Sequence, residues 1–220
     1  MRFFSNDNMV FRFSERLFDL VVLSAAWVML CIPVVTIGPA TTALYCAVVN
    51  CVRRNEPGAL RNFFASFKQN FKVGAITGVA VLVLGVLLLV SRNVFTVMAQ
   101  AGDPAGVVLY YAEGVFLVFV LGLACWLFPI LSRFTVEVGG LFRAAVQLGI
   151  KHLPTTIIVS LLVMEAAQFT LTYVYPIFLT PGLTVLLVSL FYERIFKKYT
   201  PYLPESEDDS EEENHPWYLQ

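Results

Sequence analysis

Long apolar runs with almost no charged residues recur along this chain. Residues 73–90, 107–131 and 153–174 are the clearest, and each is close to the roughly 20 residues that a helix needs to cross the hydrocarbon core of a bilayer. Charged residues make up only 14% of the sequence, against about 25% in a typical soluble domain, which is too few to cover a soluble surface. The sequence therefore predicts an all-α protein that crosses a membrane several times.

The number of membrane segments depends on how the first apolar region is divided. Residues 17–37 and 183–196 are predicted segments, while residues 40–52 are short for a full crossing. Gly38-Pro39 interrupts the apolar region, because proline cannot continue a helix without losing a hydrogen bond. We expect residues 1–199 to form a polytopic transmembrane helical bundle of five to six membrane segments. Six is favoured, and five with the N-terminus outside is the alternative.

Lysine and arginine are distributed unevenly around these segments. Of the 15 such residues, 14 lie in the N-terminal segment, in the loops 53–72 and 133–151, or at the end of the last segment. Only Arg92 lies on the other side of the predicted segments. Because positive charge marks cytoplasmic loops, we predict a multi-pass protein of the cell membrane with both termini in the cytoplasm. This orientation requires residues 17–52 to form a hairpin with Gly38-Pro39 at its outer tip.

Residues 200–220 differ in composition from the rest of the chain. Many of the 16 acidic residues lie between Glu205 and Glu213, and the segment has too few apolar residues to pack. We predict a disordered, acidic, cytoplasmic tail. Without the tail the chain is basic, which suits contact with an anionic lipid leaflet. The basic residues are scattered at helix ends rather than gathered on one face, so no nucleic-acid partner is expected.

Glu165 lies inside the run 153–174, about 18 Å along a helix from Leu153. A carboxylate at that depth costs ~2.5 kcal/mol or more unless it is paired or protonated. Gln168 lies on the same helical face, so we expect a polar stripe that faces the bundle interior or a water-filled cavity. This stripe is either a proton or substrate site or a structural hydrogen bond between helices. Arg92 and Glu113 lie at a similar predicted depth, and an Arg92–Glu165 pair is a further hypothesis.

Two other features are candidates for a functional role. Thr36, Gly38 and Pro39 form a polar helix break, which is either a plain hairpin turn or a broken helix whose backbone groups face a ligand. Phe63, Phe67 and Phe71 recur at helical spacing, with basic residues on the other side, and predict an amphipathic helix at the membrane surface. A weak repeat at an offset of about 79 residues relates this segment to residues 142–151.

Signatures of catalysis and of metal binding are not apparent. The sequence has no Gly-rich phosphate loop, no HExxH and no Gly-x-Ser-x-Gly. The 4 cysteines lie in or at the ends of apolar runs without metal-ligand spacing and are read as packing residues. We therefore expect no enzymatic activity, no cofactor and no metal.

Four motifs along the chain carry a family resemblance. They are Phe4-Ser5-Asn6-Asp7-Asn8 followed by Phe11 and Phe13, Pro33 with Thr36-Ile37-Gly38-Pro39-Ala40 and Thr42-Ala43-Leu44-Tyr45, Phe63-Phe64 with Ser66-Phe67-Lys68 and Asn70-Phe71, and Phe128-Pro129 with Arg133-Phe134. With these motifs the sequence resembles the YesL-like family of bacterial integral membrane proteins, whose function is unknown. The resemblance extends to about residue 198, and Thr36-Ile37-Gly38-Pro39-Ala40 is its most specific part.

The resemblance implies several membrane helices, no established activity and no assigned catalytic residues. Genes of such proteins often neighbour sugar ABC transporters and polysaccharide-degrading enzymes, which implies a link to carbohydrate uptake. We therefore expect an accessory protein that binds the lipid bilayer and a membrane partner such as a sugar ABC transporter permease. The alternative is a small secondary transporter or channel that uses an intramembrane carboxylate.

Overall fold

The computed structural model describes residues 9–54, 56–134, 136–173 and 175–199, and within them the chain is helical with no strand. The predicted tail at 200–220 and the first YesL-like motif at residues 4–8 lie outside the described residues. The all-α prediction is confirmed for the described part. The α-helices are α1 (Met9–Leu30), α2 (Ile37–Ala47), α3 (Ala59–Gln69), α4 (Phe71–Gln100), α5 (Pro104–Arg133), α6 (Val138–Lys151), α7 (Leu153–Tyr173) and α8 (Thr180–Tyr199).

Three shorter helical segments complete the described chain. The 3-10 segments η1 (Val34–Thr36) and η3 (Tyr175–Phe178) precede α2 and α8, and the π-helical segment η2 (Val48–Arg53) continues α2. Four stretches are long and apolar enough to cross a membrane, namely Val34–Arg53, Phe71–Gln100, Pro104–Arg133 and Leu153–Tyr173, among the residues described. The chain is therefore a membrane protein with several apolar helices. The finer count of five or six segments stays a prediction.

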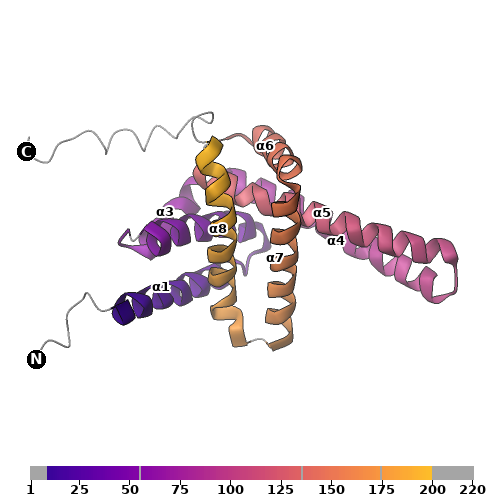
Figure 1. Cartoon of the computed structure of the whole chain (residues 1–220), viewed down its shortest axis with the longest axis horizontal. Helices are drawn as coiled ribbons and strands as arrows, with labels where there is room; N and C mark the ends of the chain where they lie inside the picture. The colour runs from indigo at the N-terminus through magenta and orange to yellow at the C-terminus, as the bar shows by residue number, and fades with distance from the viewer. Residues whose placement is uncertain (1–8, 55, 135, 174, 200–220) are drawn as a thin grey trace, which may run out of the picture.

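Two antiparallel helical hairpins, α4–α5 and α7–α8, form the larger part of the fold. In Figure 1 the α4–α5 hairpin reaches away from the rest of the molecule, and α7–α8 runs across its direction. A short amphipathic helix precedes each hairpin, α3 before α4 and α6 before α7. This shared order of elements agrees with the weak repeat in the sequence.

The stretch between the predicted apolar runs 73–90 and 107–131 is helical over most of its length. Helix α4 continues to Gln100, and α5 begins at Pro104. Gly102 has a positive φ of 84°, which glycine adopts without strain, and the Asp103 carboxylate accepts a hydrogen bond from the backbone N–H of Ala105 at 3.0 Å. The turn therefore needs only the Gly-Asp-Pro sequence. The polar residues near position 92 looked like the start of a loop, but they find partners across the hairpin.

Helix α2 and η2 lie at the centre of the fold. Leu44 and Val48 are almost fully buried, and they pack with Leu23 of α1 and Phe63 of α3 in one hydrophobic cluster. A second cluster joins α5, α6 and α8 around Trp126 and also contains Tyr45 and Val49. The same central segment therefore contributes to both clusters and connects the α1–α3 side of the molecule to the two hairpins.

The start of α2 crosses the start of α4 in direct backbone contact. A Cβ atom on Gly38 would lie 2.0 Å from the carbonyl oxygen of Gly74, and one on Gly78 would lie 2.8 Å from the Cα of Gly38. Gly74 and Gly78 are four residues apart, so they fall on one face of α4 and leave a groove that accepts α2. This contact sets the distance between α2 and the first hairpin.

Candidate functional site

The candidate site is a group of polar side chains that joins α2, η2, α5 and α8. Arg133, the last residue of α5, forms an ion pair with Glu193 of α8. The Arg133 side chain is 23% exposed and that of Glu193 only 6%. A cation in the last turn of a helix also interacts favourably with the helix dipole. The pair is thus largely withdrawn from water, where electrostatic attraction is strong and an unpaired charge is costly.

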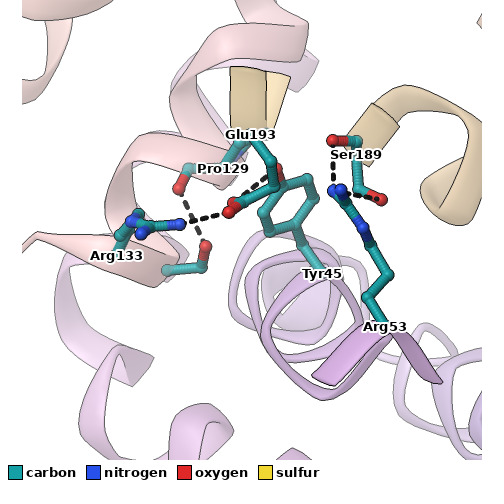
Figure 2. A network of polar contacts seen from close by, with 7 residues as sticks. Tyr45, Arg53, Pro129, Arg133, Ser189 and Glu193 are labelled. Carbon is teal, nitrogen blue, oxygen red and sulfur yellow. Dashed lines mark hydrogen bonds and ion pairs between the residues drawn. The ribbon is translucent and has the colours of Figure 1, made fainter. Parts of the chain in front are cut away.

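Two residues of the central segment complete this group. The Tyr45 hydroxyl donates a hydrogen bond to Oε1 of Glu193 at 3.4 Å, and Nη1 of Arg53 donates to the carbonyl oxygen of Ser189 at 2.6 Å and to its Oγ at 3.4 Å. Figure 2 shows these side chains converging from α2, η2, α5 and α8. We call Tyr45, Arg53, Arg133, Ser189 and Glu193 the polar clamp.

An aromatic cluster packs beside the polar clamp on α5 and α8. The rings of Trp126 and Tyr192 lie 4.2 Å apart between centroids, and Phe196 contacts both. The indole N–H of Trp126 donates to Oγ1 of Thr156 on α7 at 3.0 Å. The Tyr192 hydroxyl is buried without a hydrogen-bond partner among the described residues. Tyr45 of the polar clamp belongs to the same hydrophobic cluster as these rings, so the clamp borders an apolar region, where attraction between charges is stronger than in water.

The predicted polar stripe of α7 faces outward. Glu165 and Gln168 are both exposed, and the buried residues of α7 are Thr156, Val159 and Ser160. The prediction was that this stripe faces the bundle interior or a water-filled cavity, and the first of these two alternatives was wrong. Helix α7 buries one narrow face near its start against its neighbours, and both polar residues lie off that face. Their functional role stays a prediction.

Arg92 and Glu113 lie near each other in the α4–α5 hairpin but form separate contacts. The Arg92 guanidinium lies over the Tyr110 ring, 4.4 Å from its centroid, and Nη2 donates to the Tyr110 hydroxyl at 2.9 Å. Ser91 contacts Oε1 of Glu113, whose Oε2 is buried without a partner in the described part of the chain. The hypothesis of an Arg92–Glu165 pair fails, because Arg92 is held by its own hairpin.

The predicted helix break lies earlier than expected. Helix α1 ends at Leu30, and Gly38 and Pro39 belong to the first turn of α2, where a proline removes no helical hydrogen bond. The Thr36 hydroxyl contacts the carbonyl oxygens of Leu30 and Pro33. Gly38 and Pro39 are buried against α4. Thr36 therefore belongs to the turn before α2, and Gly38 and Pro39 belong to the packing contact between α2 and α4.

The three phenylalanines of the predicted surface helix do not share one environment. Phe63 is fully buried against α2, Phe67 is partly buried, and Phe71, which is 42% exposed, is the first residue of α4. The prediction that these three form the membrane-facing side of one helix was wrong for Phe63, which is buried, and for Phe71, which belongs to α4. Periodicity identifies the apolar face of a helix but does not tell whether protein or lipid covers that face.

A shallow groove of about 560 Å³ lies between α6 and the end of α8, lined by Lys151 and Tyr199 among others. His152 Nε2 lies 3.2 Å from the Tyr199 hydroxyl, and Nζ of Lys151 lies 5.0 Å from the centroid of the Tyr199 ring. Burial lowers the pKa of His152, and the positive charges of Lys151 and Lys198 lower it further. The lowered pKa favours the neutral imidazole, whose Nε2 accepts a hydrogen bond from the Tyr199 hydroxyl when the ring proton is on Nδ1.

Sequence reasoning missed Glu193 and the roles of Tyr45, Arg53 and Ser189. One signal was present, since Glu193 is an acid near the end of an apolar helix that otherwise ends in basic residues. No group of three His, Cys, Asp or Glu residues that could hold a metal occurs in the described ranges. The four cysteines are free thiols.

Part of the chain matches a known protein family. Residues 20–92 match the family described as "Protein of unknown function, DUF624". The YesL-like resemblance seen in the sequence is consistent with this family. The matched segment contains α2, α3 and the glycine contact with α4. No curated protein matches the chain, and no solved structure matches it.

Proposed function

We propose that this protein is a non-enzymatic accessory protein of the membrane, linked to carbohydrate uptake, which binds a partner such as a sugar transporter permease through α3. The observation that carries the proposal is an exposed apolar stripe on the outer side of this helix. Leu60 and Phe64, one helical turn apart, are 42% and 52% exposed, and Phe71 at the start of α4 is also exposed. Lys68 and Lys72 are exposed beside it.

Helix α6 presents a matching surface. Phe142, Val146 and Ile150 are spaced by four residues and are all exposed, with Arg143 and Lys151 beside them. An apolar centre with polar and cationic residues at its edge is the composition of a protein–protein interface. Two such helices, one before each hairpin, give a partner two points of attachment. The link to sugar uptake comes from the YesL-like resemblance.

Site-specific photo-crosslinking in cells tests the partner. A crosslinking amino acid at Phe64 of the full-length protein, at native expression, is expected to capture a transporter permease. Ile76 on α4 is similarly exposed, at 50%, and lies outside the stripe, so the same probe there serves as the control. Capture of lipid alone at Phe64, or of the same proteins from both positions, would overturn the proposal.

Solute uptake in cells that lack the gene tests the role. We expect uptake of an oligosaccharide to fall in the deletion strain and to return with the wild type and with Ile76→Ser, but not with Phe64→Ser at equal protein level. Normal uptake with Phe64→Ser would contradict a role for the α3 stripe. The same strains test the alternative function, a small transporter or channel.

That alternative is favoured by Glu113, a buried carboxylate with an unpartnered oxygen atom among the described residues. If Glu113 takes part in transport, Glu113→Gln abolishes uptake at normal protein level, whereas Phe64→Ser leaves uptake intact. The opposite pattern supports the accessory role. Glu165→Gln belongs in the same series, because an intramembrane carboxylate on α7 was the first sequence candidate for a transport residue.

A further inference from the structure

The groove between α6 and the end of α8 lies where the chain enters the apolar helix α7. Most of its lining is apolar, and Gln147 and Lys151, one helical turn apart on α6, form a polar row within it. The lining residues are Ala144, Val146, Gln147, Leu148, Ile150, Lys151 and Tyr199. Helix α7 starts at Leu153, the first residue of a stretch long enough to cross a membrane. The groove therefore lies at the level where lipid headgroups meet the hydrocarbon core.

The end of the groove near α7 is positively charged. Nζ of Lys151 lies 5.0 Å from the centroid of the Tyr199 ring, and the Tyr199 hydroxyl lies 3.2 Å from Nε2 of His152. Besides burial, the charges of Lys151 and Lys198 lower the pKa of His152, so both ammonium groups lie close to this ring. Two cations are thus gathered beside an apolar surface.

The described residues of α6 and α8 supply no carboxylate to balance this charge. Glu137 lies at the opposite end of α6, and Glu193 of α8 is paired with Arg133. Lys197 adds another exposed cation in the last turn of α8. The groove is therefore complementary to an anion that also carries an apolar chain, whereas a free phosphate ion would leave the apolar lining unused.

We propose that this groove binds an anionic phospholipid, with the phosphate at Lys151. The Lys151 ammonium group donates charge-assisted hydrogen bonds to the phosphate, and the Gln147 amide donates to the same headgroup. Val146 and Ile150 contact an acyl chain. The cation–π contact with Tyr199 keeps the ammonium group at the groove. Basic pockets beside membrane helices are typical binding sites for anionic headgroups.

The lipid site goes beyond the accessory role, because it needs no partner protein. Val146, Ile150 and Lys151 also belong to the exposed surface of α6, but purified protein in liposomes meets lipid alone. Loss of lipid binding at α6 and loss of partner capture at Phe64 of α3 are therefore separate results.

Crosslinking to lipid in liposomes tests the site. The purified full-length protein is reconstituted with a trace of phosphatidylglycerol or phosphatidylcholine that carries the same photoreactive acyl chain, and labelled peptides are identified by mass spectrometry. We expect phosphatidylglycerol to label Val138–Lys151 about fivefold more than phosphatidylcholine, and Lys151→Gln to remove most of this preference.

Lys72→Gln is the matched control. Lys72 corresponds to Lys151 in the sequence repeat, is exposed and does not line the groove, so its removal should leave the preference at α6 unchanged. Equal labelling by the two lipids in the wild type would overturn the proposal. An equal loss of preference in Lys72→Gln would do the same, because it would show attraction to the whole basic surface rather than binding in the groove.

Two further arms distinguish other occupants of the groove. Inorganic phosphate, compared with sodium chloride at equal ionic strength, should not displace the lipid. Neutralising the acids between Glu205 and Glu213 in the full-length chain should leave the phosphatidylglycerol labelling unchanged. Displacement by phosphate would show a site for a free anion. Labelling that appears only after the neutralisation would show that the acidic segment occupies the groove, and either result would overturn the lipid site.

Discussion

Glu193 owes its position to groups from two other helical segments. Its carboxylate contacts Arg133 of α5 and accepts a hydrogen bond from Tyr45 of α2. A buried ion pair stabilises a fold little compared with well-packed apolar residues, but one buried charge without its partner is strongly unfavourable. The polar clamp therefore favours the observed meeting of α2, α5 and α8, since separating α5 from α8 would leave a charge without its partner.

Arg133→Met should reveal this dependence. The substitution leaves the Glu193 carboxylate buried without its cation, and we expect the free energy of unfolding to fall by about 3–5 kcal/mol. Arg133→Met/Glu193→Met removes both charges and should recover most of that loss. Thermal unfolding of the purified protein in detergent measures the difference. A double variant as unstable as the single one would show that the loss does not come from an unpaired Glu193 charge.

The sequence identified intramembrane charges but not their partners. Glu165 was singled out because it lies in the middle of an apolar run, and Glu193 was passed over because it lies near basic residues at the end of one. The structure reverses this order, since Glu193 is buried and Glu165 is exposed. Depth along a helix can be counted from the sequence, whereas the side on which a neighbour packs depends on the fold.

Among the elements, the contact of α2 with α4 depends most on the absence of side chains. Gly38, Gly74 and Gly78 let the two backbones meet, and a methyl group at Gly38 or Gly78 would overlap backbone atoms of the other helix, while one at Gly74 would make a tight contact with Pro39. Backbone cannot rotate aside as a flexible side chain can. The helices would have to separate, which would disturb the burial of Leu44 and Tyr45 further along α2.

Gly78→Ala should therefore destabilise the protein although alanine favours helices. We expect a loss of about 1–3 kcal/mol, the usual cost of overpacking a tight contact. Gly85→Ala, two turns further along α4, has nothing within 4 Å of the added Cβ and should be neutral or stabilising by up to about 1 kcal/mol. Chemical or thermal unfolding of both variants provides the comparison. Equal stability of the two variants would show that α2 and α4 do not meet at Gly78.

The sequence predicted the existence of most helices better than their ends and surroundings. Apolar runs located α4, α5 and α7, because a span of that length has few alternatives. The apolar run 73–90 stops short of the end of α4 at Gln100, because polar residues such as Ser91 and Arg92 resemble a loop when their cross-hairpin partners are not known. The helical spacing of Phe63 and Phe67 predicted α3 but could not tell that α2 covers Phe63.

At the scale of the whole molecule, the two hairpins share one pattern. Each hairpin begins after an amphipathic helix, runs along one long helix and returns along a second. Most of the cations lie at the hairpin ends near α3 and α6. The turn at Gly102 lies at the far end of the first hairpin. The uneven distribution of Lys and Arg predicts that this turn and the α6 surface lie on opposite sides of the membrane.

Labelling with a membrane-impermeant maleimide tests this orientation. Ala101→Cys and Arg143→Cys place exposed thiols in the α4–α5 turn and on α6. We expect Ala101→Cys to react in intact cells and Arg143→Cys to react only after lysis, each compared with the wild-type cysteines. Reaction of both thiols from the same side would overturn the predicted topology.

The Arg133–Glu193 pair also has a consequence for the order of events during synthesis. The two residues are 60 positions apart, so at about 5–20 residues per second the ribosome makes Arg133 several seconds before Glu193. During that interval the nascent chain carries the cation unpaired, when it can help to orient α5. The arrival of α8 then neutralises the charge and locks the helix in place. Arg133 would thus first help to orient α5 during membrane insertion and later bind Glu193 in the folded protein.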